Sequence, residues 1–399
     1  MPQVLLRPIW RHALILAAGF LVGVPVPAAP FTPNSDAQVL ARIPARALDA
    51  QARELQSLRA ASKASPGDVD RAVALARRYI EAAAGDGDPR YMGYAQAALS
   101  PWWAEAAPPV AVRVQRAVLR QYGHGFDEAL VDLEAALREE PANAEAWSWL
   151  AAIRMVRAEY AEAARACEGL APLTSALLAS ACRASADSLT GRAAPASIAL
   201  AVALKTAPEA SPEERLWALT RQAEIAERRG SIAVAERAFK EALATGVADV
   251  YLRAAHADFL LDQGRAREVL ALLEDGSRAD VLLLRLAIAA KATGDKRAAG
   301  WASDLAARFA AARARGDSTH EKEEARFVLQ VQGDAPRALA LAQRNYALQR
   351  EPADARILLE TALAARQPEA ALPVQRWLDA NRVESVVLQA LAARIGGAR

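Results

Sequence analysis

The sequence predicts an all-α protein, a solenoid of stacked helix pairs, on the strength of three observations. Turn-like segments recur along the chain, the stretches between them have helical apolar spacing, and proline or aspartate stands near several joins. The turn segments read "GHGFDEAL", "RAEYAEAA", "TGRAAPAS", "RRGSIAVAE", "DQGRAREVL", "TGDKRAAG" and "QGDAPRAL".

Each turn segment contains a glycine or another small residue, and an amphipathic stretch begins two residues later. The starts of these stretches are Phe126, Tyr160, Ala193, Ile232, Ala266, Lys296 and Ala335. Successive starts are 34, 33, 39, 34, 30 and 39 residues apart. A repeated period of this length indicates units that cannot bury their apolar faces alone and therefore stack on their neighbours.

The unit that begins with "SPEERLWAL" shows how one period is built. Ser211 can cap a helix, Pro212 suits its first turn, and Glu214 completes a capping box. Gly230 ends this helix where a left-handed residue is needed. The second helix carries an apolar face of Ile232, Ala235, Phe239, Ala242 and Leu243. Prolines near the ends of second helices in other units are Pro141, Pro172, Pro208 and Pro352.

This pattern resembles the tetratricopeptide repeat, a pair of antiparallel helices with the signature W-x2-L-G-x2-Y, then A-x3-F, then P. The best copy is "AWSWLAAIRMVRAEYAEAARACEGLAP", in which Arg154 replaces the tyrosine and Cys167 the phenylalanine. Its matching positions are Trp147, Leu150, Ala151, Ala163 and Pro172. A second good copy surrounds Ala223, Ala235 and Phe239, whereas those at Lys296 and Ala335 are degenerate.

The resemblance covers residues 110–378 and, more weakly, residues 68–99. It implies a right-handed α-α superhelix in which the first helix of each pair lines the inner wall. The chain also resembles a set of uncharacterised exported repeat proteins of Gram-negative bacteria, through "LARRYIEAA", "GDPRYMGYAQAALSPWW" and "HADFLLDQGRAREVLALL". The expected organisation is a signal peptide (1–28), an extended segment (29–45), a helical cap with a degenerate repeat (46–109), the repeat array (110–378), and a capping helix with a tail (379–399).

The first thirty residues have the features of a secretory signal. Arg7, Arg11 and His12 precede an apolar stretch over residues 13–24, and cleavage after Ala28 would follow small residues. Twelve residues span about 18 Å as a helix, which is short for a bilayer core of about 30 Å. We expect a protein exported to the periplasm without a stable membrane span after cleavage, with an uncleaved anchor as the alternative.

Charge argues against a nucleic acid partner. The chain has a formal net charge of +2, and loss of the leader would bring it to neutrality. Nucleic acid binding is usually accompanied by a basic excess on one face, and none is evident here. Two cysteines, Cys167 and Cys182, would enter an oxidising compartment. With a turn near Leu173, Cys167 faces Leu178 or Ala179, so we expect two small buried side chains in preference to a disulfide.

No motif for catalysis, a metal or a cofactor is found. His124, His256 and His320 lack partners at metal-ligand spacing, and surface or capping roles are expected for them. Ser318 and Glu321 indicate a helix start beside His320. Carboxylate pairs such as Glu213 and Glu214 fall in first turns, where the helix dipole favours them. We expect no enzyme activity, no metal and no cofactor.

The first candidate for partner binding is the aromatic stretch "GDPRYMGYAQAALSPWW". Tyr91 and Tyr94 fit one helix face, whereas Trp102 and Trp103 lie in an irregular connection of about ten residues, where the helical period breaks. Adjacent side chains cannot both enter one helix face. The tryptophans either fold back to cover the neighbouring unit or form an exposed ledge for a peptide or small ligand.

The second candidate is the inner wall of the central units. Its predicted residues are Trp217, Arg221, Glu224, Tyr251, Asp258 and Arg285. This wall could hold a peptide, or it could be an ordinary solvated face. The asparagines of the family's carboxylate-gripping peptide clamp are missing, so that binding mode is not expected. The leading hypothesis is a non-catalytic periplasmic scaffold for a protein or peptide partner, in envelope protein assembly or maturation. The alternative is a sensor that binds a small ligand at Trp102–Trp103.

Overall fold

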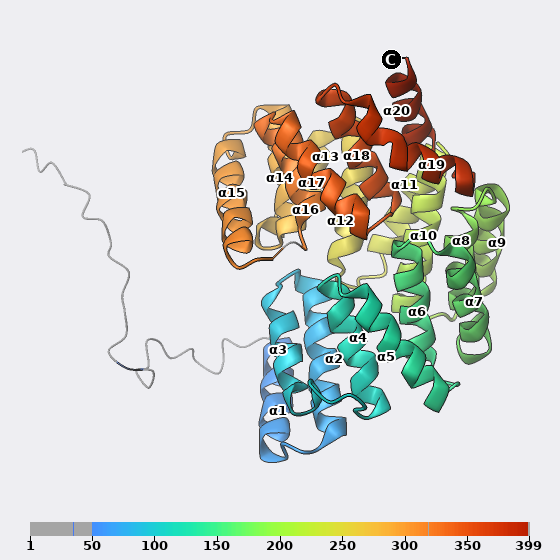
Figure 1. The fold of residues 1–399 in the computed structure, drawn as a ribbon, viewed down its shortest axis with the longest axis vertical. Coiled ribbons are helices and arrows are strands. Elements are labelled where there is room, and N and C mark those ends of the chain that lie inside the picture. Colours follow the sequence, from blue (N-terminus) through green and yellow to red (C-terminus); the bar gives the residue numbers. More distant parts are fainter. Residues whose placement is uncertain (1–34, 36–49, 318, 398–399) are drawn as a thin grey trace, which may run out of the picture. The chain divides into compact units, whose positions relative to one another are not determined.

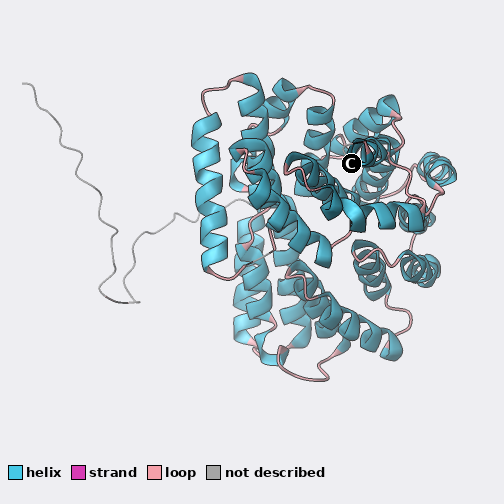
Figure 2. Cartoon of the chain, turned by 45° about the horizontal axis from the view of Figure 1, so that its top comes forward, coloured by secondary structure: helices cyan, strands magenta, loops and turns pink. Residues whose placement is uncertain are grey.

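The computed structural model describes residue 35 and residues 50–317 and 319–397, so the expected leader and most of the segment after it lie outside the described residues. The described part is helical, without strands, and the all-α fold class is confirmed (Figure 2). The helices are α1 (Ala50–Ala64), α2 (Val69–Asp86), α3 (Arg90–Ala98), α4 (Val110–Tyr122), α5 (Phe126–Glu139), α6 (Ala144–Val156), α7 (Tyr160–Leu170), α8 (Ala176–Asp187), α9 (Ala193–Thr206), α10 (Pro212–Arg228), α11 (Ile232–Leu243), α12 (Val250–Asp262), α13 (Ala266–Leu272), α14 (Asp280–Thr293), α15 (Ala298–Ala314), α16 (Glu321–Phe327), α17 (Ala335–Leu348), α18 (Pro352–Ala364), α19 (Leu372–Asn381) and α20 (Val386–Gly396). Shorter turns are η2 (Ser100–Trp102), η3 (Ala171–Leu173), η4 (Gly276–Arg278) and η6 (Pro368–Ala371), and the π-helical turn η5 (Val328–Gln332) extends α16.

Successive helices form pairs that stack along the chain, among them α2–α3, α4–α5 and α6–α7 (Figure 1). The second helix of one pair packs against the first helix of the next, as α5 does on α6 and α17 on α18. The first helices from α8 to α18 also contact one another in a row. The side chains on the common face of this row form the inner wall.

The turn within each pair contains one residue with positive φ, and these residues repeat with the predicted period. They are His124, Ala158, Gly191, Gly230, Gly264, Gly294 and Gly333. The second helix begins two residues later at every predicted start except Lys296. There α15 begins at Ala298, because the Asp295 carboxylate accepts a hydrogen bond from the Arg297 backbone N–H (2.9 Å) and extends the turn.

The helix pairs meet at small buried residues, as the repeat pattern predicts. Ala163 and Ala235 are fully buried, and α10 carries the predicted capping box between Ser211 and Glu214. Small side chains at these positions let two helix backbones approach, so the core is continuous between successive pairs.

The last helices contact much earlier units. Trp377 on α19 donates from its indole Nε1 to the Tyr160 hydroxyl on α7 (3.1 Å). The Ala193 backbone N–H at the start of α9 donates to the Glu384 carboxylate (2.6 Å), and the Arg350 N–H donates to the Val156 carbonyl (2.8 Å). The C-terminal helices therefore cover the turn edge of the central pairs, where side chains from distant repeats share one core.

The expectation for the cysteines was wrong, because Cys167 and Cys182 form a disulfide with a Cα–Cα distance of 5.6 Å. Sequence reasoning placed the hairpin turn near Leu173. In the structure η3 extends α7 to Leu173, and α8 starts only after its N-cap residue, Ser175. This later turn moves the register so that Cys182, instead of Leu178, lies opposite Cys167.

The described residues from Gln51 onward form one compact unit. No helix in the described residues combines the length and the apolar character needed to cross a membrane.

Candidate functional site

Charged side chains from the inner row of first helices meet in a network that we call the inner charged cluster. Its residues are Arg221, Glu224 and Glu227 on α10, Tyr251, Asp258 and Asp262 on α12, Arg285 on α14, Lys322, Glu323 and Arg326 on α16, and Glu351, Asp354, Arg356 and Glu360 at or on α18. No single repeat contains the cluster, because it needs helices from successive pairs to lie side by side.

Tyr251 is the aromatic member of the cluster. Its hydroxyl donates to Glu224 (2.5 Å), and the Arg221 guanidinium lies over its ring, 5.0 Å from the centroid. Arg221 also pairs with Glu224 (3.0 Å). About half of the tyrosine's surface, 51%, stays exposed despite these contacts. Tyr251 therefore presents an oriented aromatic side chain to any molecule that reaches the inner wall.

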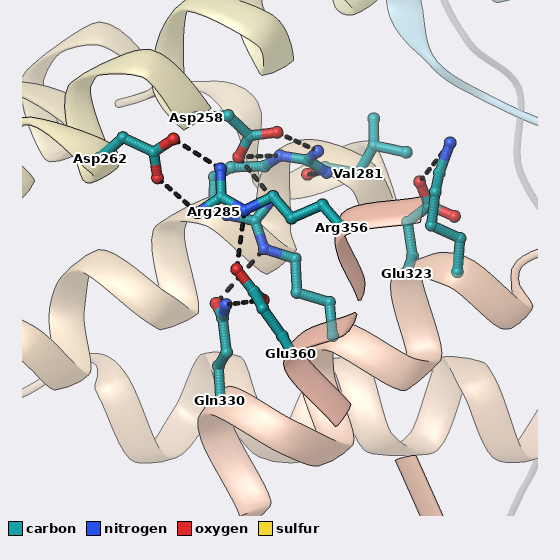
Figure 3. Close-up of polar contacts among 10 residues, drawn as sticks. Asp258, Asp262, Val281, Arg285, Glu323, Gln330, Arg356 and Glu360 are labelled. Atoms are coloured by element: carbon teal, nitrogen blue, oxygen red, sulfur yellow. Dashed lines mark hydrogen bonds and ion pairs between the residues drawn. The ribbon is translucent and has the colours of Figure 1, made fainter. Parts of the chain in front are cut away.

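Asp258 joins three helices. Its carboxylate accepts bidentate hydrogen bonds from Arg285 (3.0 and 2.6 Å) and another hydrogen bond from Arg326 (2.5 Å) (Figure 3). Burial by itself would raise the pKa of Asp258, but the two guanidinium groups hold that pKa well below its usual range. The carboxylate is thus a permanently charged link between α12, α14 and α16.

Lys322 provides the corresponding link to α18. Its ammonium lies 3.7 Å from the fully buried Asp354 and 3.9 Å from Glu323. Burial opposes its charge, but Asp354, Glu323 and Glu351 raise the pKa of Lys322 overall. Asp354 also accepts from the Asn345 amide (2.8 Å), so it is held by two elements.

Glu227 is the exception in the cluster, because no hydrogen bond or ion pair reaches its side-chain carboxyl group among the described residues. Burial, followed by repulsion from Asp262, Asp258 and Glu224, raises the pKa of Glu227 to about 8. Near neutral pH a substantial fraction of this carboxyl is protonated, and it titrates in the range where most carboxyls are already charged.

A cavity of about 690 Å³ adjoins the cluster. Arg356 and Asp262 both line it and form a bidentate ion pair (2.5 and 2.7 Å), and Arg356 also donates to Glu360, four residues further along α18 (2.7 Å) (Figure 3). Gln330 on η5 donates to Glu360 (3.4 Å) and accepts from Arg326 (3.3 Å).

The structure brings together most of the predicted inner-wall residues and separates one from them. Arg221, Glu224, Tyr251, Asp258 and Arg285 all belong to the inner charged cluster. Trp217 instead packs between the hydrophobic cores of neighbouring pairs. Sequence reasoning missed the partners on α16 and α18. Asp258 and Asp262 lie four residues apart on one helix face, where two carboxylates repel each other. This spacing could have indicated that cationic side chains from other helices pair with them.

The aromatic stretch packs against the N-terminal core. Trp102 and Trp103 are half-buried, and η2 extends the end of α3 into the irregular connection. Arg116 holds this connection by donating to the carbonyls of Trp103 (2.9 Å) and Glu105 (2.8 Å), while its own buried charge pairs with Asp132. This packing weighs against the hypothesis of a small-ligand ledge.

Tyr91 belongs to a separate aromatic group near the same core. Its ring centroid lies 6.0 Å from Tyr79 and 6.2 Å from Tyr94. Tyr79 is buried, whereas Tyr94 is 48% exposed. The prediction that Tyr91 and Tyr94 share one helix face is confirmed. Their rings contact Tyr79 and thereby pack α3 against α2.

The expectation of a surface or capping role was wrong for His256. This residue is buried and stacks on Phe239 with a centroid distance of 5.2 Å, and neither ring nitrogen has a partner among the described residues. The polar ring replaces an apolar residue in the α11–α12 interface, where period alone cannot distinguish it from a surface position. In the described residues, no three His, Cys, Asp or Glu side chains are grouped so as to hold a metal ion.

Together, the helix pairs, their period and the shared inner wall define a helical-repeat protein with the tetratricopeptide type of fold. No protein-family model matches the sequence, and no curated protein matches it. Similar solved structures include a tetratricopeptide repeat protein from Parabacteroides merdae ATCC 43184, with 15% identity, a TM-score of 0.36, and coverage of 72% of this chain and 98% of that one. The yeast Tom70 structure shows 10% identity, a TM-score of 0.31, and coverage of 87% and 96%. The APC/C heterotetramer Cut9–Hcn1 shows 10% identity, a TM-score of 0.39 and coverage of 86% of this chain, which spans 52% of the matched chain.

Proposed function

We propose that this chain is an exported, non-catalytic helical-repeat scaffold that binds a protein or peptide partner along its inner wall in the periplasm. The proposal rests mainly on the exposure and orientation of Tyr251. This aromatic side chain is half exposed on the inner wall and is oriented by Glu224 and Arg221. Oriented, partly exposed tyrosines surrounded by charged groups are favoured anchors in protein interfaces.

The charged side chains around Tyr251 support the same function. Asp258 is already paired with the buried Arg285 and with Arg326, so the polar groups that a partner would meet on this wall are preorganised. Preorganisation lowers the entropic cost of binding, because few side chains need to be ordered when the partner arrives.

Two features support export. The first is the charged and apolar pattern of the first thirty residues, which is typical of a secretory leader; it is an expectation from the sequence, because these residues lie outside the described ones. The disulfide between Cys167 and Cys182 is the second, because such bonds persist mainly in oxidising compartments, which include the bacterial periplasm.

Site-specific photocrosslinking from Tyr251 tests the proposed function. A photoreactive phenylalanine analogue would replace Tyr251 in the full chain, expressed in a Gram-negative host with its leader. Val131 on α5, which is 64% exposed outside the inner row, provides the matched control. We expect one dominant crosslinked protein from position 251 and none of the same mass from position 131. Equal crosslinking at both positions, or none at 251, would contradict binding on the inner wall.

A further inference from the structure

The cavity beside Arg356 has a lining rich in hydrogen-bond donors. It lies between the α12–α13 turn, α14, η5 and α18, and four arginines but only two carboxylates line it. The charged residues in the lining are Asp262, Arg265, Arg267, Glu268, Arg326 and Arg356. An arginine side chain offers five N–H donors and no acceptor, so the composition of the lining favours ligands that supply acceptors.

The ion pairs in the lining leave specific donors unused. Arg356 donates from Nε to Glu360 and from one N–H of each terminal nitrogen to Asp262. Arg265 uses Nε and Nη2 on Glu236 and Glu268, which leaves Nη1 without a bond in the described residues.

The remaining two guanidinium groups have more donors to offer. Arg326 donates from Nε to Gln330 and from Nη1 to Asp258, so its Nη2 has no partner among the described residues. The Arg267 side chain makes no hydrogen bond or ion pair with any described residue, although it lines the cavity. Both lining carboxylates, Asp262 and Glu268, are already paired with arginine. Arg265, Arg326 and Arg356 also pair with Glu236, Asp258 and Glu360, which lie outside the lining, so Arg267 is the lining charge without a partner among the described residues.

The rest of the cavity combines a short apolar surface with a fixed polar edge. Leu261, Ile288 and Ala292 supply the apolar part. On the opposite side, the π-helical turn presents Gln330, and Lys291 holds this turn by donating to the carbonyls of Gln330 (2.9 Å) and Val331 (2.8 Å). π-helical turns occur frequently at functional sites. A side chain with a short aliphatic segment and a terminal carboxylate matches both the apolar surface and the polar edge of this cavity.

We propose that this cavity binds an aspartate or glutamate side chain from an acidic segment of the partner, with Arg267 as the principal contact. The inference rests on the proposed function and adds the chemistry of the bound segment. Arg326 connects the two regions, because it lines the cavity and also bonds Asp258 in the inner charged cluster. A segment that lies along the inner wall at Tyr251 could therefore continue into the cavity.

Fluorescence anisotropy with defined peptides tests the inference. The probe is a fluorescein-labelled nine-residue peptide of alternating Asp and Ala, compared with the same peptide carrying Asn for Asp. We expect the full chain to bind the Asp peptide about tenfold more tightly than the Asn peptide, and the affinity to fall as salt is added. Equal affinity for the two peptides would overturn the inference.

Two arginine variants separate the cavity from general charge effects. Arg267→Glu on α13 should weaken binding of the Asp peptide about tenfold. Arg237→Glu on α11, also exposed and without a partner in the described residues, should leave the affinity within about twofold. Equal losses in both variants would mean non-specific attraction and would overturn the assignment. Circular dichroism confirms the fold, and Arg267→Gln serves if the charge reversal does not fold.

Two further results are informative. The first distinguishes a peptide carboxylate from a free small carboxylate, and the second distinguishes failure of this inference from failure of the proposed function. If free succinate displaces the peptide at equimolar concentration, the site takes small carboxylates, and the proposed peptide segment is overturned. If Tyr251 crosslinks its partner equally well in Arg267→Glu and no Asp peptide binds, this inference fails while the proposed function stands. If nothing crosslinks at Tyr251, the proposed function fails, and the partner role of the cavity fails with it.

Discussion

The indole of Trp377 donates a hydrogen bond to the hydroxyl of Tyr160, which precedes it by 217 residues. Both side chains are buried, and Tyr160 shares a core with residues from α14 to α20. In a simple linear array each repeat contacts only its neighbours. This pair therefore shows that the chain closes its last units on its early ones.

Tyr160→Phe should destabilise the protein by about 1–3 kcal/mol, because it leaves the buried Trp377 N–H without an acceptor. Urea denaturation would measure the change in the free energy of unfolding. Hydrogen exchange should show faster opening of α19 and α20. Tyr94→Phe, at an exposed position, is the control and should be close to neutral. Equal stabilities for the two variants would show that the closing hydrogen bond is dispensable.

Ala163→Leu and Ala235→Leu should each cost about 1–3 kcal/mol, because both positions are fully buried where helices meet and extra methylenes overpack them. Thermal unfolding of each variant measures the loss. Ala161→Leu and Ala233→Leu place the same change on exposed positions of the same two helices. If the buried and exposed variants unfold alike, the crossing geometry described here is incorrect.

Reduction of the disulfide should lower the free energy of unfolding by about 3 kcal/mol, since it closes a loop with a sequence separation of 15. Denaturation with and without a reductant measures this difference, and a thiol assay should find no free cysteine before reduction. The Cys167→Ser, Cys182→Ser double variant should be insensitive to the reductant. Free thiols in protein purified from the periplasm would contradict the pairing.

Acidification should destabilise the protein through His256. Burial, reinforced by Arg265, lowers the pKa of His256 from 6.5 to about 4 in the folded state. Between these values the unfolded chain binds a proton that the folded chain does not, so the free energy of unfolding decreases as the pH falls. The contribution is roughly 3 kcal/mol across this window. Urea denaturation from pH 7 to pH 4 should show a smaller decrease for His256→Leu than for the unmodified chain. Parallel curves would rule out this histidine as the cause.

Much of the local structure was determined by the sequence itself. The turn residues and second-helix starts follow from short-range rules, and Phe126, Tyr160 and Ile232 begin helices where the pattern predicted. Ser211 and Glu214 cap α10 for the same reason, since a cap depends on residues three positions apart. The inner row was likewise predictable, because the period decides which helix of each pair comes first.

Only the tertiary structure decided which residues share a site. Asp258 meets Arg326 across 68 positions of sequence, and Asp262 meets Arg356 across 94. No local spacing encodes such pairs, because they depend on how successive helix pairs rotate against one another. The disulfide shows the same limit at short range, where a slightly later turn exchanged Leu178 for Cys182 opposite Cys167. Helix starts follow from neighbouring residues, whereas a side-chain partner depends on a register that only packing of the whole chain sets.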